Sequence, residues 1–65
     1  MESVALLEMM GMTVTYVKAM PSEGCHVPSQ NVVLIRAGLH PLDLEAVAAG
    51  LLTVVLAHLS TSLHQ

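Results

Sequence analysis

The sequence predicts a small α+β domain, in which two strands pair as an antiparallel sheet and one long C-terminal helix covers them. Segments 12–20 and 31–38 are rich in the β-branched residues that favour strands. Segment 41–63 starts at a proline and then repeats apolar residues at helical spacing. A chain of 65 residues is long enough for one domain only, so we expect residues 1–65 to share a single core.

The first segment, 3–10, consists mainly of good helix formers and is followed by Gly11, a plausible helix stop. It is short for an independent helix, so a short N-terminal helix and an irregular or strand-like start both stay open. Segment 12–20 then alternates its side chains between two faces. Met12, Val14 and Tyr16 share one face, and the threonines and Val17 share the other.

The middle of the chain predicts a hairpin. Residues 21–30 include two prolines, a glycine and two serines, which indicates a loop. In the apolar run 31–38, Arg36 is the one charged residue, so both faces of this strand are expected to be covered. The two strands would pair antiparallel around the loop, and a second copy of the chain could extend the sheet at its edge.

The C-terminal helix has a clear beginning. Pro41 suits the first helical position, where its missing N–H has no partner to lose, and His40 takes the cap position. Asp43 and Glu45 then lie in the first turns, where the helix dipole favours carboxylates. A spacing of 100° per residue puts a continuous apolar stripe on one face, which predicts the side that covers the sheet. The stripe consists of Leu44, Ala48, Leu51, Leu52, Val55, Leu56, Leu59 and Leu63.

The opposite face of this helix carries no charge. It consists of Ala46, Gly50, Thr53, Val54, Ala57 and Thr61. Small residues at such spacing let two helices approach closely, in a membrane or in water. Three interpretations stay open: a face that solvent tolerates, a face packed against a second copy or a partner, and a membrane span.

Composition favours a packed face. The chain is 54% hydrophobic and 11% charged, whereas soluble domains average about 25% charged residues. A small domain with so few charges is expected to expose an apolar patch, which usually marks a contact surface. Two basic residues against five acidic ones are too few to neutralise phosphates, so nucleic acid is not an expected partner.

Localisation is predicted from the N-terminus, the single cysteine and the helix. The N-terminus lacks the basic start of a secretory signal, and Cys25 cannot form an internal disulfide, so a reducing, cytoplasmic location is expected. Residues 46–63 carry no formal charge, which reaches the lower limit for a membrane span. The last turns are polar and no aromatic or basic anchors flank the segment, so a span is disfavoured.

No motif predicts chemistry. Cys25 and His26 are adjacent, which is a poor arrangement for a nucleophile and its base or for a chelate. His58 and His64 are six residues apart, whereas helical metal ligands are spaced by three or four. We therefore expect no catalytic residue, no cofactor and no metal site. A site assembled between subunits is the alternative.

These observations together predict a small, non-catalytic, cytoplasmic protein that associates with itself or docks on a larger protein as an accessory subunit. The apolar helix and a strand edge would form the contact. The expected interface consists of Ala46, Gly50, Thr53, Val54, Ala57, Thr61 and Arg36. The alternatives are a single-span membrane subunit and, less favoured, a small oligomeric enzyme with a shared site.

Overall fold

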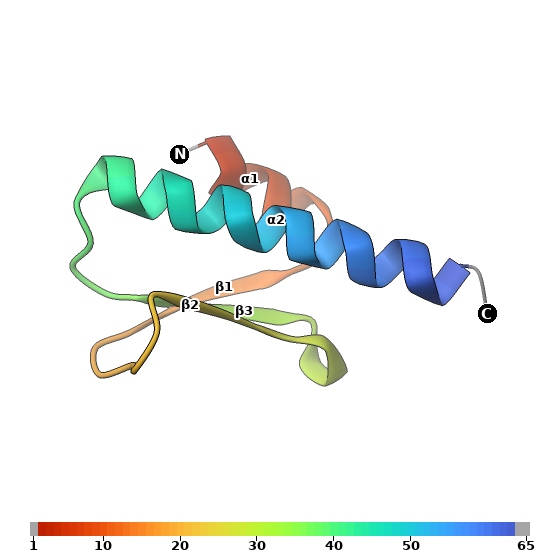
Figure 1. Ribbon diagram of the computed structural model, residues 1–65, viewed down its shortest axis with the longest axis horizontal. Coiled ribbons are helices and arrows are strands. Elements are labelled where there is room, and N and C mark those ends of the chain that lie inside the picture. Colours follow the sequence, from red (N-terminus) through yellow and green to blue (C-terminus); the bar gives the residue numbers. More distant parts are fainter. Residues whose placement is uncertain (1, 64–65) are drawn as a thin grey trace.

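The computed structural model describes the backbone of residues 2–63 and the side chains of residues 2–61. Its elements in chain order are α1 (Glu2–Met9), β1 (Thr13–Val17), β2 (Gly24–Val27), the 3-10 turn η1 (Pro28–Gln30), β3 (Val32–Arg36) and α2 (Pro41–Leu63). Both helices lie on one face of the sheet, with α1 packed against β1 and α2 over β2 and β3 (Figure 1). The predicted α+β arrangement with a long C-terminal helix is confirmed.

The predicted two-stranded antiparallel sheet is wrong in both strand number and direction. The sheet has three strands in the order β1-β3-β2. β1 and β3, which were expected to form a hairpin, run parallel, with Thr13 opposite Val32 and Val17 opposite Arg36. The third strand, β2, lies inside the expected loop 21–30 and pairs antiparallel with β3.

The course of the chain between β1 and β3 explains this topology. Pro21 and Pro28 both lie outside β2, so neither proline removes a donor from the ladder. After β1 the chain turns back and forms β2 at a distance, and η1 then reverses it again with Asn31 in the left-handed conformation, at φ 54°. β3 enters between the two earlier strands, and it is therefore parallel to β1 and antiparallel to β2.

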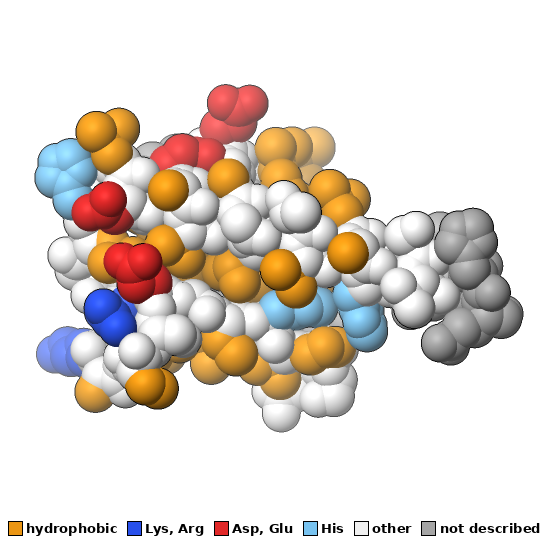
Figure 2. Space-filling view, in the orientation of Figure 1, with side chains coloured by type: hydrophobic (Ala, Val, Ile, Leu, Met, Phe, Trp, Pro, Cys, Tyr) orange, Lys and Arg blue, Asp and Glu red, His pale blue; other side chains and the backbone are white. Residues whose placement is uncertain are grey.

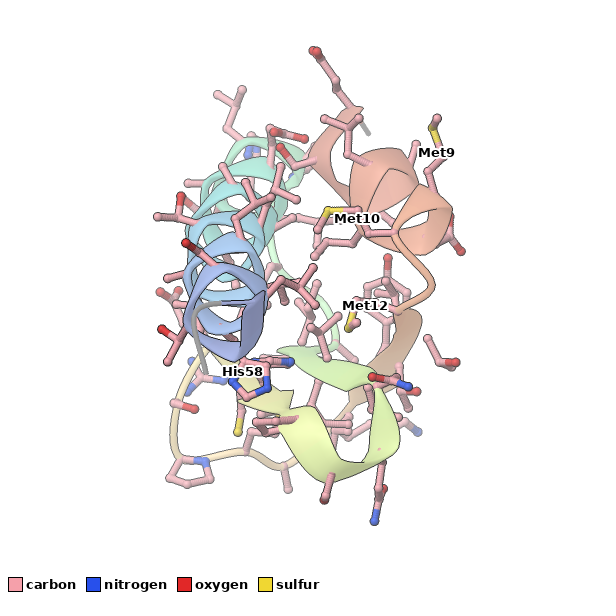
Figure 3. All side chains as sticks on the ribbon, turned by 90° about the vertical axis from the view of Figure 1, so that its right-hand side faces the viewer. Met9, Met10, Met12 and His58 are labelled. Atoms are coloured by element: carbon pink, nitrogen blue, oxygen red, sulfur yellow. The ribbon has the colours of Figure 1, made fainter. Side chains whose placement is uncertain are left out.

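The core lies between the sheet and the helix layer. Val33 and Ile35 of β3 are fully buried there. α2 contributes Ala48, Leu51 and Val55 from the predicted stripe, and α1 and the residue before β1 add Leu7 and Met12. The methionines show the orientation of α1: Met12 points into the core and Met10 toward α2, whereas Met9 points outward (Figure 3).

The predicted core stripe holds only along the first part of α2. Leu44 and Leu52 are partly buried against the core, but Leu56 and Leu59 are exposed; the Leu63 side chain lies outside the described residues. The reason is length. A helix of 23 residues extends about 34 Å, whereas strands of five residues extend about 17 Å. α2 therefore runs past the end of the sheet (Figure 1).

Hydrogen bonds close the C-terminal end of α1 and the N-terminal end of α2. Gly11, at φ 90°, ends α1 with paired backbone bonds, in which Gly11 donates to Glu8 at 3.0 Å and Met12 donates to Leu7 at 3.0 Å. His40 caps α2 as expected. Its carbonyl accepts from Leu44 N–H at 2.8 Å, and its Nδ1 accepts from Leu42 N–H at 3.2 Å.

Candidate interaction surface

The outer stripe of α2 is the set of small and apolar residues predicted to form an interface, and all of its members are exposed. They are Ala46, Gly50, Thr53, Val54, Ala57 and Thr61. Val54 retains 50% of its accessible surface, and a side chain added at Gly50 would meet no atom within 4 Å. The structure of the single chain thus leaves this stripe open to a partner.

The two polar side chains of the outer stripe turn their hydroxyl groups inward. Thr53 Oγ1 donates to the Ala49 carbonyl at 3.2 Å, and Thr61 Oγ1 donates to the Ala57 carbonyl at 3.0 Å. A threonine that bonds back to its own helix has used its donor, so its hydroxyl group can only accept a hydrogen bond from water or a partner. Neither threonine of the stripe therefore offers a free hydroxyl donor to a partner.

Formal charge on α2 is confined to its N-terminal end. Asp43 and Glu45 are in the first two turns, and no Asp, Glu, Lys or Arg follows between residues 46 and 61. Figure 2 shows the acidic and basic side chains gathered toward the end of the molecule where α2 begins, with none along its far half. The exposed part of α2 from Ala46 to Thr61 is thus a long surface without formal charge.

The overhang of α2 widens this surface. Leu59 points in the same direction as the core residues of the helix, yet it is 41% exposed because the sheet does not extend beneath it. Leu56, at the flank, is 52% exposed. Two leucines are therefore exposed at the C-terminal half of α2, Leu56 at the flank and Leu59 on the side opposite the outer stripe.

A second apolar surface lies on the other side of the molecule. Neighbouring residues of a strand face opposite ways, and Val33 and Ile35 face the helices. The alternate residues of β3, and the residues of β1 and β2 that pair with these alternate residues, therefore face away from the helices, where no element of the described chain covers the sheet (Figure 1). This open sheet face includes Val17, Val27, Val32 and Leu34, all partly buried, with Cys25 and the threonines of β1 exposed.

Arg36 lies on the open sheet face, away from the outer stripe of α2. It is opposite Val17 in register, and its Nη2 donates to the Met20 carbonyl at 3.1 Å. The guanidinium therefore binds the backbone of the connection that follows β1. The structure does not bring Arg36 together with the six helical interface residues, and its contact with a partner stays a prediction.

The residues considered for chemistry are separated. Cys25 is exposed, and its position next to His26 on a strand puts the two side chains on opposite sheet faces. His64 is outside the described residues. Within residues 2–61, no three His, Cys, Asp or Glu side chains gather in one place and no pocket is present. One pair does meet: the rings of His26 and His58 are 5.5 Å apart between centroids.

The sequence reasoning missed two features. Both faces of the strand in 31–38 were expected to be covered, but within the described residues one face of the sheet has no element over it. The contact of His26 with His58 was also missed, because it depends on β2 lying beneath α2. A signal was present in the alternation of Cys25, His26 and Val27 between the prolines, although three residues are too few to predict a strand.

Comparison with known proteins finds no matching family model, curated protein or solved structure.

Proposed function

We propose that the protein is a small non-catalytic interaction module that associates with a second copy of itself through the outer stripe of α2. The observation that carries the proposal is the exposed, uncharged surface of this helix from Ala46 to Thr61. A partner would remove that apolar area from water, which is favourable by about 25 cal/mol per Å². The same surface would serve if the partner were a larger protein, to which this chain would be an accessory subunit.

The size of the core supports a need for association. The helices and the sheet form two layers, and the molecule measures only 15 Å along its shortest axis. A chain of this size buries about 60% of its unfolded surface and usually needs a disulfide, a metal or a partner for stability. With one cysteine, the chain cannot form an internal disulfide. Association would supply the missing burial.

The stripe suits close packing of two helices. Gly50 lies near its middle with Ala46 and Ala57 on either side, so the backbones of two antiparallel copies could approach closely there. A two-fold arrangement would place the charged N-terminal end of each α2 away from the centre of the contact, where charges would be costly. Leu56, at the flank of the helix, would lie at the border of the contact.

Sedimentation velocity over a wide range of protein concentrations tests the proposal. The wild-type chain is expected to sediment as a dimer or larger species, and Ala57→Glu, with a charge in the stripe, as a monomer. Ala5→Glu is the matched control, because it makes the same substitution at an exposed alanine of α1. A wild-type chain that is monomeric throughout, or an Ala57→Glu chain that sediments like wild type, would contradict self-association.

A second candidate, a single-span membrane subunit, is favoured by the composition of the same helix. Pro41–Thr61 has a mean hydropathy of 1.7, and only 17% of the window that defines it is buried. This stretch is about 31 Å long, enough to cross the hydrocarbon layer. Insertion would, however, take Leu51 and Val55 out of the core. Recovery of the expressed chain in the membrane pellet, with detergent needed for release, would favour this candidate over a cytoplasmic dimer.

A further inference from the structure

We propose that His26 and His58 form a binding site for a transition-metal ion that prefers imidazole ligands, such as Zn²⁺ or Ni²⁺. His26 is on β2 and His58 is on α2, on the side of the helix that faces this strand (Figure 3). Their rings are edge to face, with 5.5 Å between centroids and 78° between planes. The fold therefore brings together two imidazoles that are 32 positions apart in the sequence.

The separation of the rings fits a shared ion. Zn–N distances are 2.0–2.1 Å, so two imidazoles bound to one tetrahedral ion have centroids about 5.2 Å apart. The observed 5.5 Å differs from this by a few tenths of an ångström. Binding would require the rings to rotate about their side-chain bonds until one nitrogen of each points to the shared ion. His58 is exposed and free to rotate in this way.

The surroundings admit a cation. His26 is partly exposed and His58 exposed, so an ion can reach both rings from solvent. The two basic side chains do not compete: Lys18 follows β1 at the far edge of the sheet, and Arg36 lies on the open sheet face. The chain has a net charge of −3, which favours cations in general. Water would complete the coordination of the ion.

The site would join the overhanging half of α2 to the sheet. An ion that binds the folded chain and not the unfolded one raises stability with its concentration. Each imidazole is held by a different element, so both are in place only when β2 and α2 are packed together. Metal binding is thus expected to stabilise this contact and to be lost when either histidine is removed.

Thermal unfolding at pH 7.5 with increasing Zn²⁺ tests the site, because imidazole binds metal in its neutral form. The unfolding midpoint of the wild-type chain should rise with Zn²⁺ and continue to rise with the logarithm of its concentration, and Mg²⁺, which prefers oxygen ligands, should leave it unchanged. His26→Gln and His58→Asn should each weaken binding about 100-fold, because a single ligand loses the chelate effect. Cys25→Ser and His40→Asn, where asparagine keeps the helix cap, should respond as wild type does.

Imidazole ¹⁵N chemical shifts provide a readout that does not depend on stability. Addition of Zn²⁺ should move the ring signals of His26 and His58 together and leave that of His40 in place. An unfolding midpoint that does not change when Zn²⁺ is added would overturn the proposal. Retention of the full Zn²⁺ response in His26→Gln would also overturn it, because the ion would then be bound without β2.

Discussion

The carboxylate of Glu45 on α2 accepts two hydrogen bonds from Ser3 in the first turn of α1, one from the backbone N–H at 3.0 Å and one from the hydroxyl group. Ser3 is only 6% exposed, and its N–H is one of the donors that the start of a helix leaves without an intrahelical partner. Glu45 therefore serves α1 as a cap supplied from another helix. The negative charge also lies at the positive end of the α1 dipole.

This contact makes stability depend on pH. The hydroxyl of Ser3, and then its backbone N–H, hold the pKa of Glu45 below its ordinary value of 4.5. A lowered pKa in the folded state contributes stability that is complete above the unfolded value and is lost as pH falls through the folded value. The free energy of unfolding of wild type should therefore fall below about pH 4.5, and that of Glu45→Gln should fall less. Urea titrations at neutral and acidic pH measure both.

Glu23→Gln provides the control for this prediction. It makes the same change of charge at an exposed position of the connection before β2. Its unfolding free energy should fall on acidification as that of wild type does. If Glu45→Gln instead follows the same acid dependence as wild type, the bond to Ser3 does not contribute to stability.

Gly24 is predicted to tolerate no side chain. A Cβ at this position would be 2.7 Å from Val47 Cγ1 and 3.0 Å from Leu51 Cδ1, both on α2. Gly24→Ala should force the helix from the strand and lower the free energy of unfolding by about 1–3 kcal/mol. Chemical denaturation provides the measurement. A stability equal to that of wild type would mean that β2 does not pack beneath α2 as described.

Gly24 also shows why β2 could not be predicted. Glycine disfavours strands, and its neighbours between Pro21 and Pro28 have the composition of a loop. The glycine lets side chains of α2 approach this strand closely, which is a tertiary contact that local composition does not reveal. β1 and β3 were found because β-branched residues are a local signal, but local signals do not fix which strands pair. β1 and β3 run parallel because the chain forms β2 between them and so reverses its direction twice.

Gly50 is predicted to behave in the opposite way. It lies in the interior of α2, and a Cβ there would meet no atom within 4 Å. Gly50→Ala should therefore raise the free energy of unfolding by about 0.5–1 kcal/mol, because alanine loses less backbone entropy in a helix. Urea denaturation at a protein concentration where the chain is monomeric separates this effect from association. A lower stability at such dilution would mean that the outer stripe is not open in the single chain.

The helix was the most predictable part of the molecule, and the reason is its periodicity. The cap at His40, the start at Pro41 and the buried side of the first turns followed from residue type and a 100° spacing alone. The exposure of Leu56 and Leu59 could not be predicted in this way. Periodicity shows which side of the helix faces the core, but not how far the sheet extends beneath the helix. The outer stripe was named from sequence, and the structure leaves it exposed as a candidate.

Val54 and Val55 are neighbours on α2 and provide a matched pair of substitutions. Val55 is 1% exposed in the core, whereas Val54 is 50% exposed on the outer stripe. Val55→Ala should lower the free energy of unfolding by about 2 kcal/mol, from lost burial and the cavity left behind. Val54→Ala should change it by no more than about 0.5 kcal/mol in the monomer. Urea denaturation of both variants at high dilution gives the comparison, and equal losses would contradict the orientation of α2 over the sheet.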